Sequence, residues 1–339
     1  MEIKSFIKAV SYYLPEFALD NDTIQNKFPE WPSKKIVEKT GIQTRYISTN
    51  NQTSGDMAIE AANKLFNEYN IDRSIIDYLI LCTQSPDYFL PTTACIIQEK
   101  LGLSTTIGAF DMNLGCSGYV YGLGLAKGLI QSNQAKNILF ITAESYSKFI
   151  HPEDKGNRTI FGDAAAATLI SSESGFAEIL NFEYGTNGKG AENLIVKNGA
   201  FRNYTNKFSQ FKDKYAETNP DDFLYMNGQE IFLFTLSAVP KLILNTLQKN
   251  NIQKENIDLY ILHQANKFML DSLMKKSNID KDKFYVHIEN CGNTVSSTIP
   301  IAFYHAKKQN RLSVGNHILL AGFGVGYSWG GTILKIISK

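Results

Sequence analysis

The amino-acid sequence predicts an α/β protein built from two similar halves. Short apolar runs bounded by polar turn residues recur along the chain, which is typical of strands covered on both faces of a sheet. Four of these runs have counterparts in the same order in the second part of the chain, and a helical stretch lies between the second and third run of each set. At 339 residues, the chain is long enough for two domains or one duplicated domain, each able to bury a core.

The repeat begins with a helix end, a turn and a strand at residues 70–82, which resemble residues 251–263. The other predicted strands pair 107–112 with 284–289, 137–142 with 317–322, and 164–170 with 329–334, and the helical stretches are 118–132 and 296–308. A single matching pair of apolar strands is expected by chance. Four pairs in the same order instead indicate two α/β halves related by a pseudo-twofold axis.

We place the boundary between the halves near residue 174, which gives an N-terminal half of residues 1–174 and a C-terminal half of residues 175–339. The segment 188–226 has no counterpart in the first half. Its Asn, Lys, Asp and Tyr content predicts a long inserted loop that lies over the surface or over a pocket.

Composition excludes several classes of function. The 34 basic side chains nearly cancel the 33 acidic ones, so no global field selects nucleic acid or a membrane surface. The first residues lack a signal peptide, and no stretch approaches the roughly 20 apolar residues of a membrane span. The four cysteines show neither the pattern of a disulfide framework nor that of a zinc site. We therefore expect a soluble, cytoplasmic protein without a bound metal.

Cys116 lies where a predicted strand ends, glycines allow a tight turn and a helix of small residues begins. The N-terminus of a helix offers unpaired backbone N–H groups and the positive end of the helix dipole, which favour a thiolate and the oxyanion of an attacked thioester. Cys82 and Cys95 lie within apolar runs, and we expect them, like Cys291, to be buried packing residues.

His263 ends one strand of the second half, and Asn293 lies in a glycine-bearing turn before a helix. Alone, each would be interpreted as structural. The repeat makes the turns at Cys116 and Asn293 equivalent, and pseudo-symmetry brings such strand ends to one crevice. The glycine-rich segment 322–331 lets the backbone approach closely and is a candidate source of a further oxyanion N–H, whereas no phosphate-binding helix pattern follows it.

These segments resemble the third type of ketoacyl-acyl-carrier-protein synthase, in the thiolase superfamily. The resemblance covers nearly the whole chain, and its motifs appear in the family's order: the Cys116 segment, Ile160-Phe161-Gly162-Asp163-Ala164-Ala165-Ala166, Met226-Asn227-Gly228-Gln229-Glu230-Ile231-Phe232, His263-Gln264-Ala265-Asn266, Gly292-Asn293-Thr294 and the stretch 324–331. It implies a duplicated, five-layered αβαβα sandwich, usually a homodimer.

The resemblance also implies a chemistry. Cys116 would take an acyl group from coenzyme A and condense it with malonyl on an acyl carrier protein, with no permanently bound cofactor and with thioesters of coenzyme A and of the carrier's phosphopantetheine as substrates. His263 and Asn293 would hydrogen-bond the malonyl thioester carbonyl. The backbone amides of Cys116 and Val325 would bind the acyl-transfer oxyanion, and Phe323 would shield the malonyl end.

Four positions carry a residue that differs from the one usual in the family. Lys35 occupies the place of a Trp that stacks on adenine, and Trp31 lies four residues earlier. Lys39 and Lys155 occupy positions of arginines that hold the nucleotide, so we expect attraction to the coenzyme A phosphates with weaker adenine recognition. At the acyl-pocket position, Leu90 replaces a Phe common in short-chain members, which predicts a primer longer than acetyl.

Carrier proteins are acidic, so a local basic patch is expected on this nearly neutral chain. Lys267, Lys275 and Lys276 follow His263 on a predicted helix and are candidates for that patch. The three lysines are explained nearly as well as part of an ordinary solvent-exposed helix face that binds no partner.

Two other functions remain open. One keeps Cys116 but transfers the acyl group to an oxygen, nitrogen or β-keto acceptor in a specialised pathway. The other is a non-catalytic subunit of a heterodimer, against which the intact set of Cys116, His263 and Asn293 argues. Within the superfamily, the absence of a second Cys in 322–331 argues against a thiolase, and Asn293 in place of a His argues against an elongating synthase.

Overall fold

The strands of the two halves form one ten-stranded sheet whose order reads the same from both ends. The computed structural model describes residues 3–203 and 219–338. The sheet order is β12-β11-β13-β14-β8-β1-β7-β6-β4-β5, so β5 matches β12, β4 matches β11, β6 matches β13, β7 matches β14 and β1 matches β8. The strand bounds are β1 Phe6–Tyr13, β4 Tyr78–Cys82, β5 Gly108–Met112, β6 Asn137–Glu144, β7 Ala164–Ser171, β8 Ala177–Thr186, β11 Leu259–Leu262, β12 Phe284–Tyr285, β13 His317–Gly324 and β14 Ser328–Ile336.

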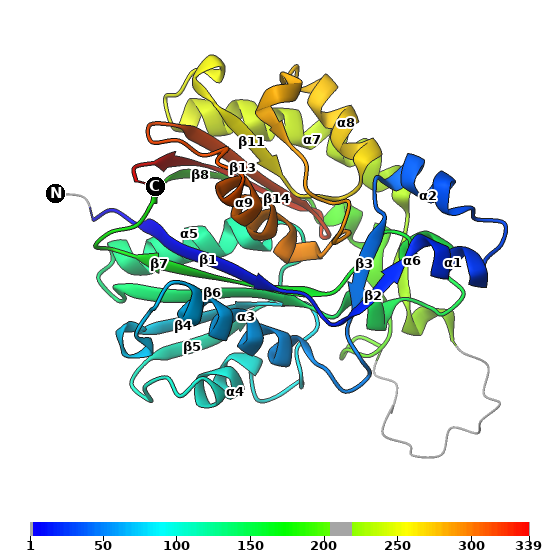
Figure 1. The fold of residues 1–339 in the computed structure, drawn as a ribbon, viewed down its shortest axis with the longest axis horizontal. Helices are drawn as coiled ribbons and strands as arrows, with labels where there is room; N and C mark the ends of the chain where they lie inside the picture. The colour runs from blue at the N-terminus through cyan, green and yellow to red at the C-terminus, as the bar shows by residue number, and fades with distance from the viewer. Residues whose placement is uncertain (1–2, 204–218, 339) are drawn as a thin grey trace.

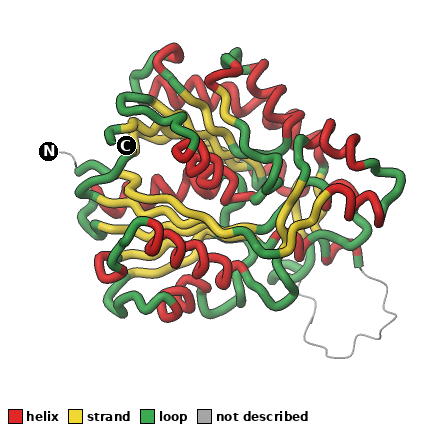
Figure 2. Tube along the Cα trace, viewed as in Figure 1, coloured by secondary structure: helices red, strands yellow, loops and turns green. Residues whose placement is uncertain are grey.

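The helices lie in three layers around the two halves of the sheet (Figure 1). Helices α3 and α4 cover one outer face, α7 and α8 cover the other, and α5 and α9 lie between the halves. Their bounds are α3 Ser54–Glu68, α4 Thr93–Lys100, α5 Gly118–Gln131, α7 Gly228–Lys249, α8 Lys267–Lys276 and α9 Thr298–Lys308. Figure 2 shows the same alternation of helical and strand layers. The predicted five-layered, duplicated α/β fold is confirmed.

Asparagines at matching positions end the helices of both halves. Asn70 and Asn251 follow α3 and α7 with φ angles of 49° and 52°, and Asn133 and Asn310 follow α5 and α9 with φ angles of 57° and 55°. Asn tolerates this left-handed conformation better than most residues and commonly ends helices. The repeat therefore extends from the strands to the backbone conformation of the turns.

The central core is shared between the halves. Helix α5 of the first half packs on β4 and β6 of its own half and also on β13 and β14, and α9 of the second half packs on β11 and also on β1 and β7. Tyr119 and Leu123 of α5 and Ile299 and Phe303 of α9 belong to one buried apolar cluster. The halves also meet directly, since Phe6 and Ile7 of β1 pair with Glu178 and Ala177 of β8.

Two parts of the second half differ from the prediction. The strand expected at 284–289 stops after Tyr285, because the side-chain oxygen of Gln264 accepts the backbone N–H of His287 at 2.7 Å and replaces a strand partner. The segment 188–226, expected to be a loop, contains a small antiparallel sheet of β9 (Leu194–Val196) and β10 (Leu224–Met226), whose short apolar runs pair with each other. Residues 204–218 of this segment lie outside the described residues.

A small subdomain projects beside the main sheet (Figure 1). It consists of β2 (Phe17–Asp20), α1 (Asn21–Lys27), α2 (Ser33–Thr40) and β3 (Thr44–Ile47), and α6 (Lys155–Arg158) lies next to it. The Arg45 guanidinium is fully buried and donates to the Asn21 side chain at 2.7 Å, which ties β3 to α1.

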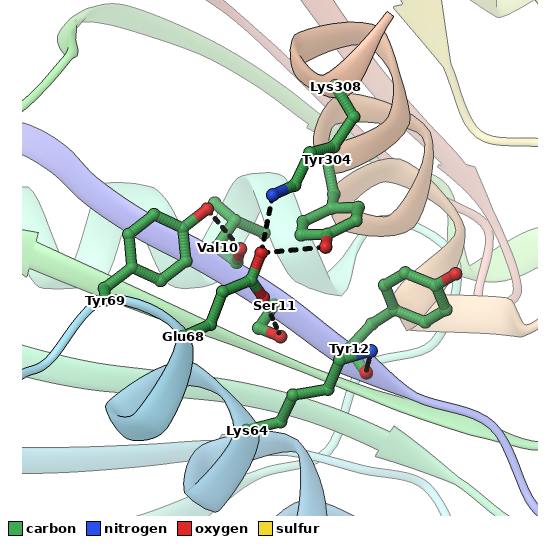
Figure 3. Close-up of polar contacts among 8 residues, drawn as sticks. All are labelled: Val10, Ser11, Tyr12, Lys64, Glu68, Tyr69, Tyr304 and Lys308. Atoms are coloured by element: carbon green, nitrogen blue, oxygen red, sulfur yellow. Dashed lines mark hydrogen bonds and ion pairs between the residues drawn. The ribbon is translucent and has the colours of Figure 1, made fainter.

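Polar side chains join α3, β1 and α9 along the part of β1 that follows its short pairing with β8. Figure 3 shows the Glu68 carboxylate accepting from Tyr304 at 2.9 Å and from Ser11 at 3.1 Å, with the Lys308 ammonium 2.8 Å away. The ion pair and hydroxyl donors lower the pKa of Glu68 although burial opposes them. An outer helix and an inner helix are thereby fixed on opposite sides of one strand.

Helix α7 has the length and composition of a membrane-spanning helix, which the sequence analysis did not anticipate. Among the described residues it alone meets that criterion, with 22 residues and a mean hydropathy of 1.4 in its most apolar stretch. It packs on β8, β13 and β14. A long helix covering a sheet in a globular protein has the same properties.

Candidate active site

Cys116 lies in the turn between β5 and α5, as predicted. A hydrogen bond of 2.8 Å from the Gly118 backbone N–H to the Gly115 carbonyl closes the turn. The next residue, Ser117, shares a hydrogen bond of 2.7 Å with Ser328 of β14. The turn is thus fixed to the second half, and only 6% of the Cys116 surface is exposed.

The end of β13 passes directly beside Cys116. A Cβ atom on Gly324 would lie 2.8 Å from both the Cβ and the Sγ of Cys116, and one on Gly322 would lie 2.8 Å from the Cys116 carbonyl oxygen. Glycine is therefore needed at both positions for the strand to approach this closely. The approach also brings the Val325 backbone amide to the Cys116 sulfur, where it acts as a hydrogen-bond donor.

Burial keeps Cys116 in the thiol form in the free protein. Loss of solvent raises the pKa of Cys116 to about 12, the Val325 amide acts in the opposite direction, and Glu144 raises the pKa further. The expectation that the helix N-terminus would favour a resting thiolate is therefore wrong for the free protein. Desolvation disfavours the charged form more strongly than nearby dipoles favour it.

His263 follows β11 and lies next to β13. Its backbone N–H donates to the Ala321 carbonyl at 2.8 Å, its ring meets Phe323 edge-on at 5.6 Å, and its Nδ1 lies 2.7 Å from the Thr298 hydroxyl. The side chain is 2% exposed, and burial lowers the pKa of His263 to about 3. The imidazole is therefore neutral at physiological pH.

Asn293 is held by backbone hydrogen bonds to the first half. Its N–H donates to the Ile160 carbonyl at 2.9 Å, and its carbonyl accepts from Gly162 at 3.0 Å. The side-chain Oδ1 accepts from the Val295 backbone N–H at 2.9 Å. This leaves the Nδ2 amide of Asn293 as a donor for another group.

The turns that carry Cys116 and Asn293 touch. A Cβ atom on Gly118 would lie 3.7 Å from the Cβ of Ser296, and Cys116, Val295 and Phe323 belong to one buried cluster. The ends of β5, β11, β12 and β13 therefore converge on one buried place that contains a thiol, a neutral imidazole and a free amide donor.

Comparisons with known proteins show the family to which this chain belongs. Family models described as 3-oxoacyl-[acyl-carrier-protein (ACP)] synthase III and its C-terminal part match residues 110–188 and 247–336. The beta-ketoacyl-[acyl-carrier-protein] synthase III of Clostridium perfringens is 37% identical over 324 residues, which cover 96% of this chain and 97% of the relative. The chain belongs to the 3-oxoacyl-[acyl-carrier-protein] synthase III family. It is thus a condensing acyltransferase, and its family acts in fatty-acid biosynthesis.

Solved structures place this synthase in the same fold. A crystal structure of a 3-oxoacyl-(acyl-carrier-protein) synthase III superposes with a TM-score of 0.92 at 47% identity and covers 98% of this chain and 100% of its own. A synthase from Burkholderia xenovorans superposes with a TM-score of 0.90 at 35% identity, covering 99% of this chain and 95% of its own.

Only some of the predicted site residues of the synthase lie near Cys116. Phe323, 1% exposed, and Val325 lie beside Cys116. Leu90 is 81% exposed on the loop after β4, next to the exposed Tyr88 and Phe89, so it does not line an acyl pocket within this chain.

The predicted cationic residues lie on three helices away from Cys116: α2, α6 and α8. Lys39 is exposed on α2, and Lys155 forms an ion pair with Glu30 and lies over the Phe28 ring. Lys267 pairs with Asp271 on α8, and the exposed Lys275 and Lys276 end that helix.

The burial of the cysteines was a further expectation. All four cysteines are free, and Cys82 and Cys291 are buried as predicted. Cys95 is exposed, contrary to the prediction, because α4 buries its neighbour Ala94 and leaves the next position facing solvent. In the part of the chain that the structure describes, no group of three or more His, Cys, Asp or Glu side chains could hold a metal ion.

Sequence reasoning missed three buried polar residues near the site: Glu144, Ser296 and Thr298. Glu144 ends the largely apolar and buried strand β6, and an acid at a buried strand end was the available signal. Burial raises the pKa of Glu144 to about 8, although hydrogen bonds from Gln84, Ser296 and Ser85 lower it.

Proposed function

We propose that this synthase carries an acyl group as a thioester on Cys116 and joins it to the malonyl group of an acyl carrier protein, with loss of carbon dioxide. The product is a 3-oxoacyl thioester. The observation that carries the proposal is the convergence of a thiol, a neutral imidazole and a free amide donor at the buried strand ends. The division into halves at residues 1–174 and 175–339 belongs to the same proposal.

In the first step, the Cys116 sulfur attacks the carbonyl carbon of an acyl thioester. The carbon–sulfur bond to the donor then breaks, and the donor thiol leaves with the proton that Cys116 loses. The amides of Val325 and Cys116 stabilise the oxyanion, which is supported by the contact between the Val325 amide and the sulfur. Storing the acyl group covalently divides one difficult reaction into two easier ones.

In the second step, the bond between the malonyl α-carbon and its carboxylate breaks, and the electron pair forms an enolate. Carbon dioxide leaves, the enolate carbon attacks the Cys116 thioester carbonyl, and the Cys116 sulfur leaves as a thiolate that takes up a proton from water. Asn293 Nδ2 and His263 Nε2 donate to the enolate oxygen. Thr298 holds the imidazole in place, because its hydroxyl lies 2.7 Å from His263 Nδ1 and donates to the Val295 carbonyl at 3.0 Å.

The experiment separates the two half-reactions. His263→Ala and Asn293→Asp should still gain acyl mass at Cys116 but should release little carbon dioxide from malonyl-acyl carrier protein. Cys116→Ser should gain no stable acyl thioester. Full acylation of the wild-type protein without carbon dioxide release would instead favour transfer to another acceptor. Failure of Cys116 to acylate with any donor would favour a non-catalytic subunit.

We propose acyl-coenzyme A and acyl carrier protein as the substrates, with no permanently bound cofactor and with the protein in the cytoplasm. Lys39 and Lys155 would attract the coenzyme A phosphates, although Glu30 partly neutralises Lys155. Lys267, Lys275 and Lys276 would face the acidic carrier. Isothermal titration with coenzyme A, comparing the wild type with Lys39→Glu, tests the first assignment, and unchanged affinity would exclude Lys39.

A homodimer is the proposed assembly. The edge of β5 ends the sheet, and Tyr88, Phe89 and Leu90 are 62%, 65% and 81% exposed on the loop after β4. Such a run of apolar side chains is typical of a surface that another chain covers. In a dimer, Leu90 would reach the acyl pocket from the partner chain. Light scattering of the wild type and of Phe89→Asp tests the assembly, and a monomeric wild type would contradict it.

A further inference from the structure

Three consecutive hydroxyl residues follow the turn that carries Asn293, and each is bonded in a different direction. Ser296 donates to Glu144 Oε1 at 2.9 Å, Ser297 meets the Thr142 hydroxyl at 2.9 Å, and Thr298 meets His263 at 2.7 Å. Glu144 and Thr142 lie on β6 of the first half, whereas His263 lies in the second half. The position of the Asn293 turn therefore depends on both halves.

Glu144 bonds to the other side of the site with its second oxygen. Its Oε2 accepts from the Gln84 backbone N–H at 3.1 Å and from the Ser85 hydroxyl at 3.2 Å. The Gln84 side chain in turn lies against the nucleophile turn, since a Cβ atom on Gly115 would be 2.5 Å from its Oε1. One fully buried carboxyl group thus contacts the surroundings of Cys116 with one oxygen and the Asn293 turn with the other.

The Asn293 turn needs such support because its backbone is strained. Val295 has a φ angle of 54°, a left-handed conformation that a β-branched side chain disfavours. This conformation directs the Val295 N–H to Asn293 Oδ1 and its carbonyl to the Thr298 hydroxyl. The bond from the adjacent Ser296 to Glu144 holds the turn in this conformation.

Asp163 carries another buried carboxyl group, and its partners differ from those of Glu144. It is equally buried, but its carboxylate accepts from the backbone and hydroxyl groups of Ser48 and Ser147, all within the first half. Glu144 differs because its partners belong to both halves, so a change at Glu144 alters the position of one turn relative to the other.

We propose that Glu144 is a positioning residue for the condensation step: its carboxyl group, through Ser296, fixes the Asn293 turn relative to Cys116. The inference rests on the proposed function, because it assumes that Asn293 acts only after Cys116 is acylated. Acyl transfer to Cys116 uses the Val325 and Cys116 amides and does not depend on the Asn293 turn.

The test compares the two half-reactions in Ser296→Ala and Glu144→Gln. Ser296→Ala removes the bond to Glu144 Oε1, and Glu144→Gln removes acceptor capacity while keeping the size of the side chain. We expect acylation of Cys116, followed by intact-protein mass, to stay within about twofold of the wild type. Condensation should fall by about 10- to 100-fold, as expected when a reacting group is displaced by up to about 1 Å.

Ser11→Ala is the matched control, because Ser11 also donates a buried hydroxyl to a glutamate, Glu68 (Figure 3), but this pair contacts none of the residues of the candidate site. It should change neither half-reaction. Equal losses of acylation and condensation in Ser296→Ala and Glu144→Gln, or wild-type condensation in both, would overturn the inference. If either variant fails to fold, the other decides. Loss of condensation in Asn293→Asp with none in Ser296→Ala would refute the role of Glu144 and leave the proposed function intact.

Discussion

Replacement of Gly324 by Ala tests whether the close approach of β13 to the nucleophile is needed for acyl transfer. The new Cβ would lie 2.8 Å from both the Cβ and the Sγ of Cys116. Ordinary contacts between such atoms are about 3.5–4.0 Å, so the strand or the nucleophile must move by about 1 Å. Such overpacking costs about 1–3 kcal/mol of folding stability. A displacement of about 1 Å at a reacting atom lowers the rate by about 100-fold.

The assay measures the rate of acyl mass gain at Cys116 together with the thermal unfolding midpoint. Gly128→Ala is the control, since Gly128 is exposed on α5 and a Cβ there would meet nothing within 4 Å. We expect this variant to acylate normally and to be about 0.5–1 kcal/mol more stable, because alanine favours a helix. Wild-type acylation by a folded Gly324→Ala variant would refute the argument that this glycine is needed for the chemistry.

Three other expectations follow from the charges and burial. Reversing Lys275 and Lys276 to Glu should raise KM for malonyl-acyl carrier protein by about 2- to 30-fold, if each exposed pair contributes about 0.2–1 kcal/mol; an unchanged KM would remove both from the interface. Because burial lowers the pKa of His263 to about 3, the unfolded chain binds a proton between pH 6.5 and 3 that the folded protein does not. The free energy of unfolding should therefore decrease as pH falls, and urea titrations should show a slope up to about 1.4 kcal/mol per pH unit smaller in His263→Ala. Finally, the wild type should acylate faster with medium-chain donors than with acetyl-coenzyme A, and Leu90→Phe should reduce that preference; equal or faster reaction with acetyl-coenzyme A would contradict the assignment of Leu90.

The sequence was sufficient to predict the fold and the strand ends near the site. Matching apolar runs identified the duplication, and the duplication related the Cys116 turn to the Asn293 turn. Both predictions depend on features that are local in sequence, namely strand periodicity and the glycines that allow tight turns. The strand after Lys283 was predicted too long, because the interruption comes from the Gln264 side chain, which is distant in sequence.

The bonds between the halves could not be predicted in the same way. Glu144 and Ser296 are separated by 152 residues, and nothing near either one indicates the other. The pKa of Cys116 also depends on burial by the second half, so the local helix signal gave the wrong protonation state. Exposure of Leu90 likewise depends on which chains surround the loop after β4.

The layer of inner helices shared by the two halves has a consequence for how the protein unfolds. Helices α5 and α9 each pack on strands of both halves, so separating the halves would expose one side of each helix to water. Chains longer than about 250–300 residues commonly divide into domains that melt independently. Here the shared layer couples the halves, so we expect differential scanning calorimetry to show a single unfolding transition. The turns that carry Cys116 and Asn293 should unfold together at that temperature.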